Sequence, residues 1–372
     1  MLFSLDLLTP KFVAFEKLNN ELLYFLEHAV PVGDFNRTCL SAGAIGKACW
    51  DNAKRPKGKE KLTKDKFQAL HCELQKLTQA DRQRLFETAR DNQNLQGLFE
   101  APNHQLLTFL TLGCFTALKE LSSHLYCSTK SLQPVIDACG SVTINAHFEN
   151  FKRVNGEVCR ACGLERIAPF RADTPIEKQW RADYDHLLCK SKYPIYAVHP
   201  NNLFPICQTC NQDAKKAEDM FFCHSKKRPR AAFYPFTESA QDYVKLALKN
   251  DRDPEVCIQL SWLTDDALIQ AKLKTWDDVY QIKKLVEGRF ISLANIIEDE
   301  LKAVSLDDLQ ANIAREVARP PSAATLKRKP EAFWLHKLYS YLVSIDLAPI
   351  WEQCHFIEEE HGEPGAEFIL RG

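Results

Sequence analysis

Residues 185–216 read DHLLCKSKYPIYAVHPNNLFPICQTCNQDAKK and contain the cysteine pair Cys207 and Cys210. A second Cys-x-x-Cys pair, Cys159 and Cys162, lies upstream. Each pair forms a tight turn that directs two thiolates to one point, and two pairs supply the four sulfur ligands of a tetrahedral Zn²⁺. We therefore predict one structural zinc site. The main alternative, a redox-active dithiol, would need only one pair.

The segment between the two cysteine pairs is long enough to hold structure of its own. It contains an alternating run from Trp180 to His186, then a loop, then a second extended run from Asn202 to Cys207. Basic residues follow the second cysteine pair, as at the start of a helix. The sequence predicts the order strand, loop, strand, helix, with Trp180 and Tyr184 packed inside and His199 in a solvated loop. Gly163 is expected at positive φ.

At this point the residues resemble a known family. The stretch 185–216 is similar to the HNH (ββα-metal) endonucleases, in which an Asp-His pair ends the first strand and a cysteine pair opens the helix. The variants it resembles most have a Lys-Ser-x-Tyr-Pro stretch and occur among HNH effectors of bacterial anti-phage defence systems. The resemblance covers Cys159 to about Lys216, with a weaker similarity at 233–236. It implies an α+β fold with a zinc-stabilised ββα-metal core.

The resemblance also implies roles for the polar residues of this core. His186 is expected to act as the general base, because a neutral imidazole suits that task near pH 7. Asp185 and Asn211 are expected to hold one catalytic Mg²⁺ or Mn²⁺ at the scissile phosphate. Asn202 is expected to fix the loop that orients His186. Alternatively, Asp185 and His186 merely satisfy a strand end.

Four lysines are predicted to contact the phosphates that flank the reaction centre: Lys190, Lys192, Lys215 and Lys216. Two positions depart from the family pattern. The final histidine of the pattern is Asn211 here, a form that also occurs in active members. Cys189 stands where many relatives have proline, and we interpret it as a buried residue without a role in catalysis.

Charge is distributed unevenly along the chain. Residues 151–230 carry 15 basic and 9 acidic side chains, a net charge of +6, whereas residues 231–372 have a net charge of −8. Phosphate contacts supply most of the non-specific affinity for nucleic acids, so the middle of the chain is the expected place for a polyanion. The alternative is that these charges form ordinary solvated faces.

We predict three parts. Residues 1–140 form a helical N-terminal region, with helical spacing at 18–26, 67–77 and 110–125. Residues 141–235 form the nuclease core with its four-cysteine zinc site. Residues 236–372 form an acidic, helix-rich region with helices near 239–249, 276–302 and 331–345, a strand at 258–262, a linker at 319–330 and an acidic tail at 358–372.

No run of apolar residues is long enough for a membrane span, and no export signal is visible. We therefore expect a cytoplasmic protein without membrane contact. The predicted function is metal-dependent hydrolysis of DNA, expected to be double-stranded, by a monomer that nicks, acting with partner proteins of a defence system. The alternative is a zinc-stabilised nucleic-acid-binding or scaffold module without catalysis.

Overall fold

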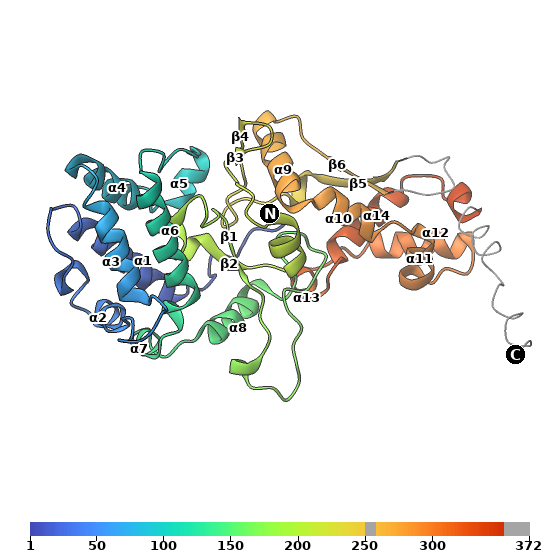
Figure 1. Ribbon diagram of the computed structural model, residues 1–372. Helices are drawn as coiled ribbons and strands as arrows, with labels where there is room; N and C mark the ends of the chain where they lie inside the picture. The colour runs from blue at the N-terminus through green and yellow to red at the C-terminus, as the bar shows by residue number, and fades with distance from the viewer. Residues whose placement is uncertain (250–257, 353–372) are drawn as a thin grey trace, which may run out of the picture.

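Helices dominate the computed structural model, which describes residues 1–249 and 258–352. Small antiparallel strand pairs make it an α+β fold, as predicted. Figure 1 shows an elongated molecule in which the helices of the N-terminal region, the short strands of the middle and the C-terminal region follow one another. None of the described helices is both long and apolar enough to cross a membrane. The predicted acidic tail lies outside the described residues.

The N-terminal region consists of helices, which confirms the three predicted from helical spacing. They bury their apolar faces against one another; α1 buries Leu18, Leu22 and Phe25. The helices of this region are α1 (Val13–His28), α2 (Ala44–Asp51), α3 (Thr63–Leu74), α4 (Gln79–Asp91), α5 (Leu95–Glu100), α6 (Leu112–Cys127) and α7 (Gln133–Ala138). The next helix, α8 (Ile144–Asn155), opens the part predicted as residues 141–235 and buries His147 and Phe148.

The middle of the chain has the predicted order of strand, loop, strand and helical turn. Strand β1 (Tyr184–His186) pairs antiparallel with β2 (Leu203–Pro205). The helical segment after the second cysteine pair, Thr209–Lys215, is a π-helical turn. Strand β1 begins at Tyr184, so the expected start of the strand near Trp180 is wrong. A second small pair, β3 (Phe222–Cys223) and β4 (Arg228–Pro229), follows.

The C-terminal region corrects two predictions. The segment expected to be a helix at 239–249 contains strand β5 (Val244–Leu248), which pairs with the predicted strand β6 (Ile258–Trp262). The expected linker at 319–330 contains a short helix, α13. The helices of this region are α9 (Ala267–Tyr280), α10 (Ile282–Arg289), α11 (Leu293–Asn295), α12 (Leu306–Val317), α13 (Ala323–Arg328) and α14 (Ala332–Leu342), with a π-helical turn at Ile296–Leu301.

Both ends of the described chain cover the first cysteine pair. The indole N–H of Trp276 in α9 donates to the carbonyl of Ala161 at 2.9 Å, and that of Trp334 in α14 donates to the carbonyl of Cys162 at 2.7 Å. The N-terminal strand-like segment donates from the Leu2 amide to the same Ala161 carbonyl. The three parts of the chain therefore share one continuous apolar core.

Candidate functional site

Four cysteines converge in the middle of the molecule. The sulfur atoms of Cys159, Cys162, Cys207 and Cys210 lie within 4.8 Å of one another, and all four residues are buried. The Cys162 and Cys207 sulfurs are 3.9 Å apart. Zinc–sulfur bonds of about 2.3 Å in a tetrahedron separate the sulfurs by about 3.8 Å. Gly163 has φ of 71°, as predicted, so that the chain can turn after the first pair.

Backbone amides point at these sulfurs. The amide of Leu164 donates to the Cys162 sulfur at 3.4 Å, and that of Cys207 donates to the Cys159 sulfur at 3.4 Å. The amide of Cys210 donates to the Cys207 sulfur at 3.5 Å. Such N–H groups stabilise negative charge on sulfur, and thiolates are the form that binds metal. The donor set therefore fits a zinc ion, which would join the first cysteine pair to the second.

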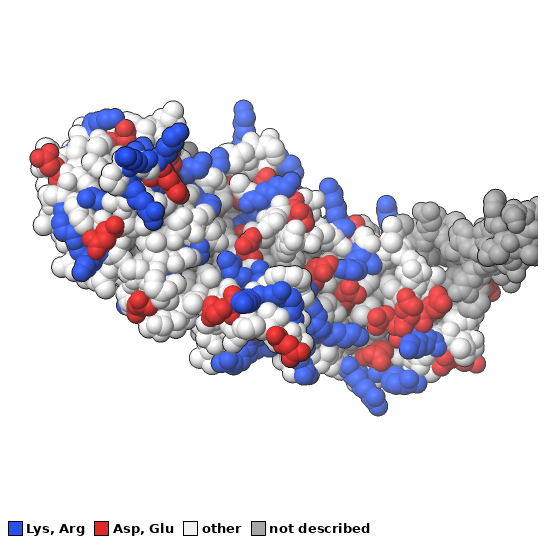
Figure 2. Space-filling model, turned by 60° about the horizontal axis from the view of Figure 1, so that its bottom comes forward, with Lys and Arg blue, Asp and Glu red and all other residues white. Residues whose placement is uncertain are grey.

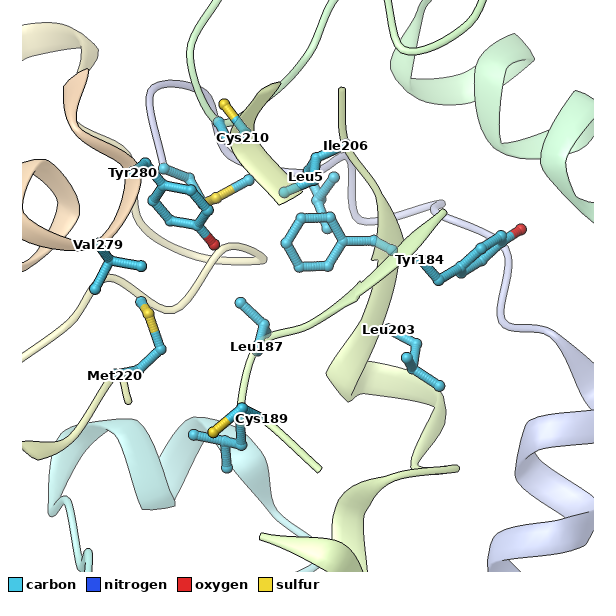
Figure 3. Packing of buried hydrophobic residues seen from close by; sticks show 14 of the residues in the cluster. Leu5, Tyr184, Leu187, Cys189, Leu203, Ile206, Cys210, Met220, Val279 and Tyr280 are labelled. Carbon is cyan, nitrogen blue, oxygen red and sulfur yellow. The ribbon is translucent and has the colours of Figure 1, made fainter. Parts of the chain in front are cut away.

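Strand β1 divides the predicted catalytic residues between two faces. Successive side chains of a strand point to opposite sides, so Tyr184 and His186 share one face and Asp185 takes the other. Figure 3 shows the same division, with Tyr184 and Tyr280 on opposite sides of the strand and Tyr280 beside Cys210. His186 thus faces the N-terminal helices, and Asp185 faces α9.

The ring of His186 is held in one tautomer. Its Nε2 lies 3.0 Å from the carbonyl oxygen of Ala197. A carbonyl only accepts hydrogen bonds, so Nε2 carries the proton and Nδ1 keeps its free electron pair. Burial, and after it the positive charges of Lys190 and Lys215, lower the pKa of His186 to about 3. His186 is therefore neutral throughout the physiological pH range, and the same low pKa makes it a weaker base than a free imidazole.

The N-terminal region supplies the surroundings of His186. The rings of His186 and Tyr126, the latter in α6, meet edge to face with centroids 4.4 Å apart. The ammonium nitrogens of Lys130 and Lys190 lie 4.7 Å and 4.9 Å from the centroid of the Tyr126 ring. Burial lowers the pKa of Lys130 to about 8. Lys130 is buried and donates to the carbonyls of Tyr126 and Cys127, and within the described residues neither Lys130 nor Lys190 forms an ion pair with a carboxylate. We name His186, Tyr126, Lys130 and Lys190 the histidine cradle.

Sequence reasoning identified His186 and Lys190 but missed Tyr126 and Lys130. These two lie almost 60 residues before His186, and no motif marks them. The spacing between the regions says nothing about which helix covers the strand. Only the fold, in which the hydroxyl of Tyr126 donates to the Tyr184 carbonyl at 3.3 Å, brings α6 against β1.

Asn202 fixes the loop that follows β1. Its side-chain oxygen accepts from the amide of Leu188 at 2.8 Å, and its side-chain nitrogen donates to the carbonyls of Leu188 and Tyr196 at 3.1 and 2.9 Å. Asn202 is fully buried. The segment that carries the Ala197 carbonyl is thereby tied to the end of β1, which holds the His186 ring in place.

The predicted catalytic metal pair is arranged differently from the expectation. The carboxylate of Asp185 forms a buried ion pair with Lys215 and accepts a hydrogen bond from the Tyr280 hydroxyl at 3.0 Å. Asp185 is 2% exposed and Lys215 is 1% exposed. The side chain of Asn211 donates to the Asp183 carbonyl at 3.2 Å. As arranged, Asp185 and Asn211 do not fit a shared Mg²⁺ or Mn²⁺, because the ammonium of Lys215 holds the carboxylate.

The remaining predicted residues fall into two groups. Lys192 and Lys216 are exposed and Lys190 is half-buried, so a phosphate can reach them. Lys215 is enclosed and paired with Asp185, so in this arrangement its ammonium does not face a phosphate. Cys189 is buried, as interpreted.

His199 is also buried, which corrects the expectation of a solvated loop residue. Its Nε2 donates to the carbonyl of Gln93 at 3.1 Å, and its Nδ1 accepts from the amide of Asn201 at 3.2 Å. Burial lowers its pKa to about 4. His199 thus ties the loop before β2 to the N-terminal region.

Comparisons with models of protein families, with curated proteins and with solved structures found no match for the chain.

Proposed function

We propose that the protein is a nuclease of the HNH type that hydrolyses phosphodiester bonds at the histidine cradle, with DNA as substrate. One observation carries the proposal. Nε2 of His186 is held by the Ala197 carbonyl, which leaves Nδ1 as the nitrogen that can take a proton, and the ammonium groups of Lys130 and Lys190 lie against the Tyr126 ring that packs on His186. A neutral nitrogen base near lysine ammonium groups suits an anionic ester and the water that attacks it.

The chemistry assigns one task to each group. Nδ1 of His186 takes a proton from a water molecule, whose oxygen forms a bond to phosphorus while the bond from phosphorus to the leaving 3′ oxygen breaks. The leaving oxygen takes a proton from solvent. Negative charge grows on the phosphoryl oxygens in the transition state, and the ammonium groups of Lys130 and Lys190 stabilise it. Asn202 holds the loop that carries the Ala197 carbonyl, and this carbonyl orients the His186 ring.

The zinc site would support this chemistry without taking part in it. Four thiolates leave no open coordination position, which is the mark of a structural site. Bound zinc would hold β2 and the π-helical turn against the first cysteine pair. The family resemblance adds a catalytic Mg²⁺ or Mn²⁺ and a role in anti-phage defence with partner proteins, and both stay predictions.

The alternative function is a zinc-stabilised module that binds nucleic acid, or serves as a scaffold, without cleaving. The ion pair between Asp185 and Lys215 favours this alternative, because it occupies the carboxylate that the resemblance assigns to a catalytic ion. Such a module would bind polyanions with a steep dependence on salt and release no product.

A plasmid nicking assay separates the two functions. We expect the zinc-loaded wild-type protein to convert supercoiled plasmid to the open circle in Mg²⁺ or Mn²⁺, and His186→Ala to be at least about 100-fold slower, since general bases contribute about 10² to 10⁴ in rate. His28→Ala, at an exposed helix end, is the control. Nicking by His186→Ala at the wild-type rate, or no nicking by the wild type, would contradict the proposal.

An added arm of the assay replaces the divalent cation with a chelator after zinc loading, with zinc content measured at the end. If cleavage stops while zinc is retained, the reaction requires a divalent cation. Lys215 would then have to leave Asp185 for that ion to bind there. Cleavage that continues would assign the reaction to the histidine cradle alone. This arm tests only the need for a divalent cation; the role of His186 is tested by the His186→Ala variant.

A further inference from the structure

The loop 168–181, which leads into β1, displays apolar side chains to solvent. Phe170 is 65% exposed, Trp180 is 58% exposed and Ile176 is 50% exposed. In Figure 1 this loop extends below the middle of the molecule, beside α8. The sequence predicted that Trp180 packs inside, and the structure shows the opposite. Exposed apolar side chains carried by one loop mark a candidate interaction site.

Side-chain hydrogen bonds hold the loop in one conformation. The buried side chain of Gln179 spans it, donating to the carbonyls of Arg171 and Thr174 at 2.7 and 2.8 Å and accepting from the Arg171 amide at 3.0 Å. The side chain of Asn145, in the first turn of α8, donates to the Glu177 carbonyl at 2.8 Å. The backbone is therefore ordered before any partner binds, which lowers the entropic cost of binding.

Cations accompany the exposed rings. The guanidinium carbon of Arg171 lies 4.5 Å from the centroid of the Trp180 ring. The ammonium of Lys152 lies 5.8 Å from the centroid of the Phe170 ring and is paired with Glu149 at 2.9 Å, so Arg171 is the cation that a phosphate can reach here. Figure 2 brings the lower side of the molecule forward and shows Lys and Arg side chains across its middle, with Asp and Glu between them. Aromatic rings next to cations match a strand of stacked bases and phosphates.

The loop also lies within reach of the histidine cradle. His186 follows Trp180 by six positions along the chain, so their Cα atoms are at most about 20 Å apart. That length corresponds to about six stacked nucleotides at 3.4 Å each. One nucleic acid strand can therefore contact both places.

We infer that Phe170 and Trp180 form a stacking platform for unpaired bases of a strand bound at the histidine cradle. The inference rests on the proposed function and narrows its substrate to single-stranded or locally unpaired nucleic acid. Stacking needs open base faces, which a duplex offers only at its ends, whereas lysine contacts to phosphates treat both forms alike.

Binding measurements test the platform without cleavage. Full-length, zinc-loaded His186→Ala protein is titrated against a fluorescein-labelled 16-nucleotide single strand of mixed sequence, and against the same strand in a blunt duplex, by fluorescence anisotropy at fixed salt. Trp180→Ala and Phe170→Ala are added on this background. Ile291→Ala, an apolar residue that is 71% exposed elsewhere, is the matched control.

We expect Trp180→Ala to weaken single-strand binding about 10-fold, in line with the loss of one aromatic–base stack, and to change duplex binding less than about 2-fold. Trp180→Phe should restore most of the affinity, and Ile291→Ala should change nothing. Unchanged single-strand binding by Trp180→Ala, or equal losses for single strand and duplex, would overturn the inference. So would the absence of binding to either probe, which would leave the loop to a protein partner.

The outcomes also distinguish this inference from the proposed function. If Trp180→Ala selectively loses single-strand binding and the wild-type protein does not cleave, the stacking platform is supported and the proposed nuclease function is contradicted. If cleavage depends on His186 but binding does not change in Trp180→Ala, the nuclease function is supported and the stacking platform is contradicted.

Discussion

Replacing Cys207 with Ser is expected to unfold the middle of the molecule and to reduce zinc from one ion per chain to a small fraction of that. Cys207 is buried, and its sulfur lies 3.9 Å from that of Cys162. Structural zinc in small domains contributes on the order of 10 kcal/mol. That is comparable to the ~5–15 kcal/mol by which whole domains are stable. Loss of the ion therefore removes most of the folding free energy.

Zinc content by elemental analysis and thermal unfolding by circular dichroism measure this effect. Cys72→Ser, at an exposed cysteine in α3, is the matched control and should retain the wild-type zinc content and unfolding temperature. A Cys207→Ser protein that is soluble, unfolds at the wild-type temperature and nicks plasmid at the wild-type rate would contradict a structural role for zinc at these cysteines.

Breaking the buried ion pair is expected to cost about 3–5 kcal/mol of the free energy of unfolding. In Asp185→Ala the ammonium of Lys215, which is 1% exposed, loses its carboxylate and cannot reach water. An unpaired buried charge has about this cost, whereas an exposed pair contributes less than about 1 kcal/mol. Urea unfolding at pH 7 measures the difference. Asp278→Ala, which removes the partner of the more exposed Lys274, is the control.

The double variant Asp185→Leu with Lys215→Met completes the test. It replaces both charges with apolar groups of similar size, so we expect it to recover most of the stability lost in Asp185→Ala. Wild-type stability in Asp185→Ala would show that the pair is not closed in solution. In that event Asp185 would again be a candidate ligand for a divalent cation.

Local patterns predicted the parts of the fold that depend on neighbouring residues. The two cysteine pairs predicted the sulfur cluster, and the turn after the first pair required Gly163 at positive φ. Helical spacing predicted α1, α3 and α6 because each buries one apolar face. The wrong prediction of a helix at 239–249 also has a local cause. Val244 and Leu246 are buried and Lys245 is exposed, a two-residue period that indicates a strand.

Contacts between distant segments could not be predicted. The hydroxyl of Tyr280 reaches Asp185 across 95 residues, and the indole of Trp334 reaches the first cysteine pair across 172 residues. Tyr126 comes to His186 in the same way, from a helix whose own pattern shows only that it has a buried face. The pairing of Lys215 with Asp185 depends on how the π-helical turn meets β1, which spacing alone does not determine.

The proposed reaction depends most on the protonation of one imidazole ring, which nitrogen NMR measures directly. Long-range proton–nitrogen correlation spectra of zinc-loaded protein with ¹⁵N-labelled histidine, assigned with His186→Ala, would report both ring nitrogens at pH 7 and pH 5. We predict that His186 carries its proton on Nε2, with Nδ1 unprotonated at both pH values, because burial lowers its pKa to about 3. A proton on Nδ1 at pH 7 would contradict the account, because that nitrogen could then take no proton from water.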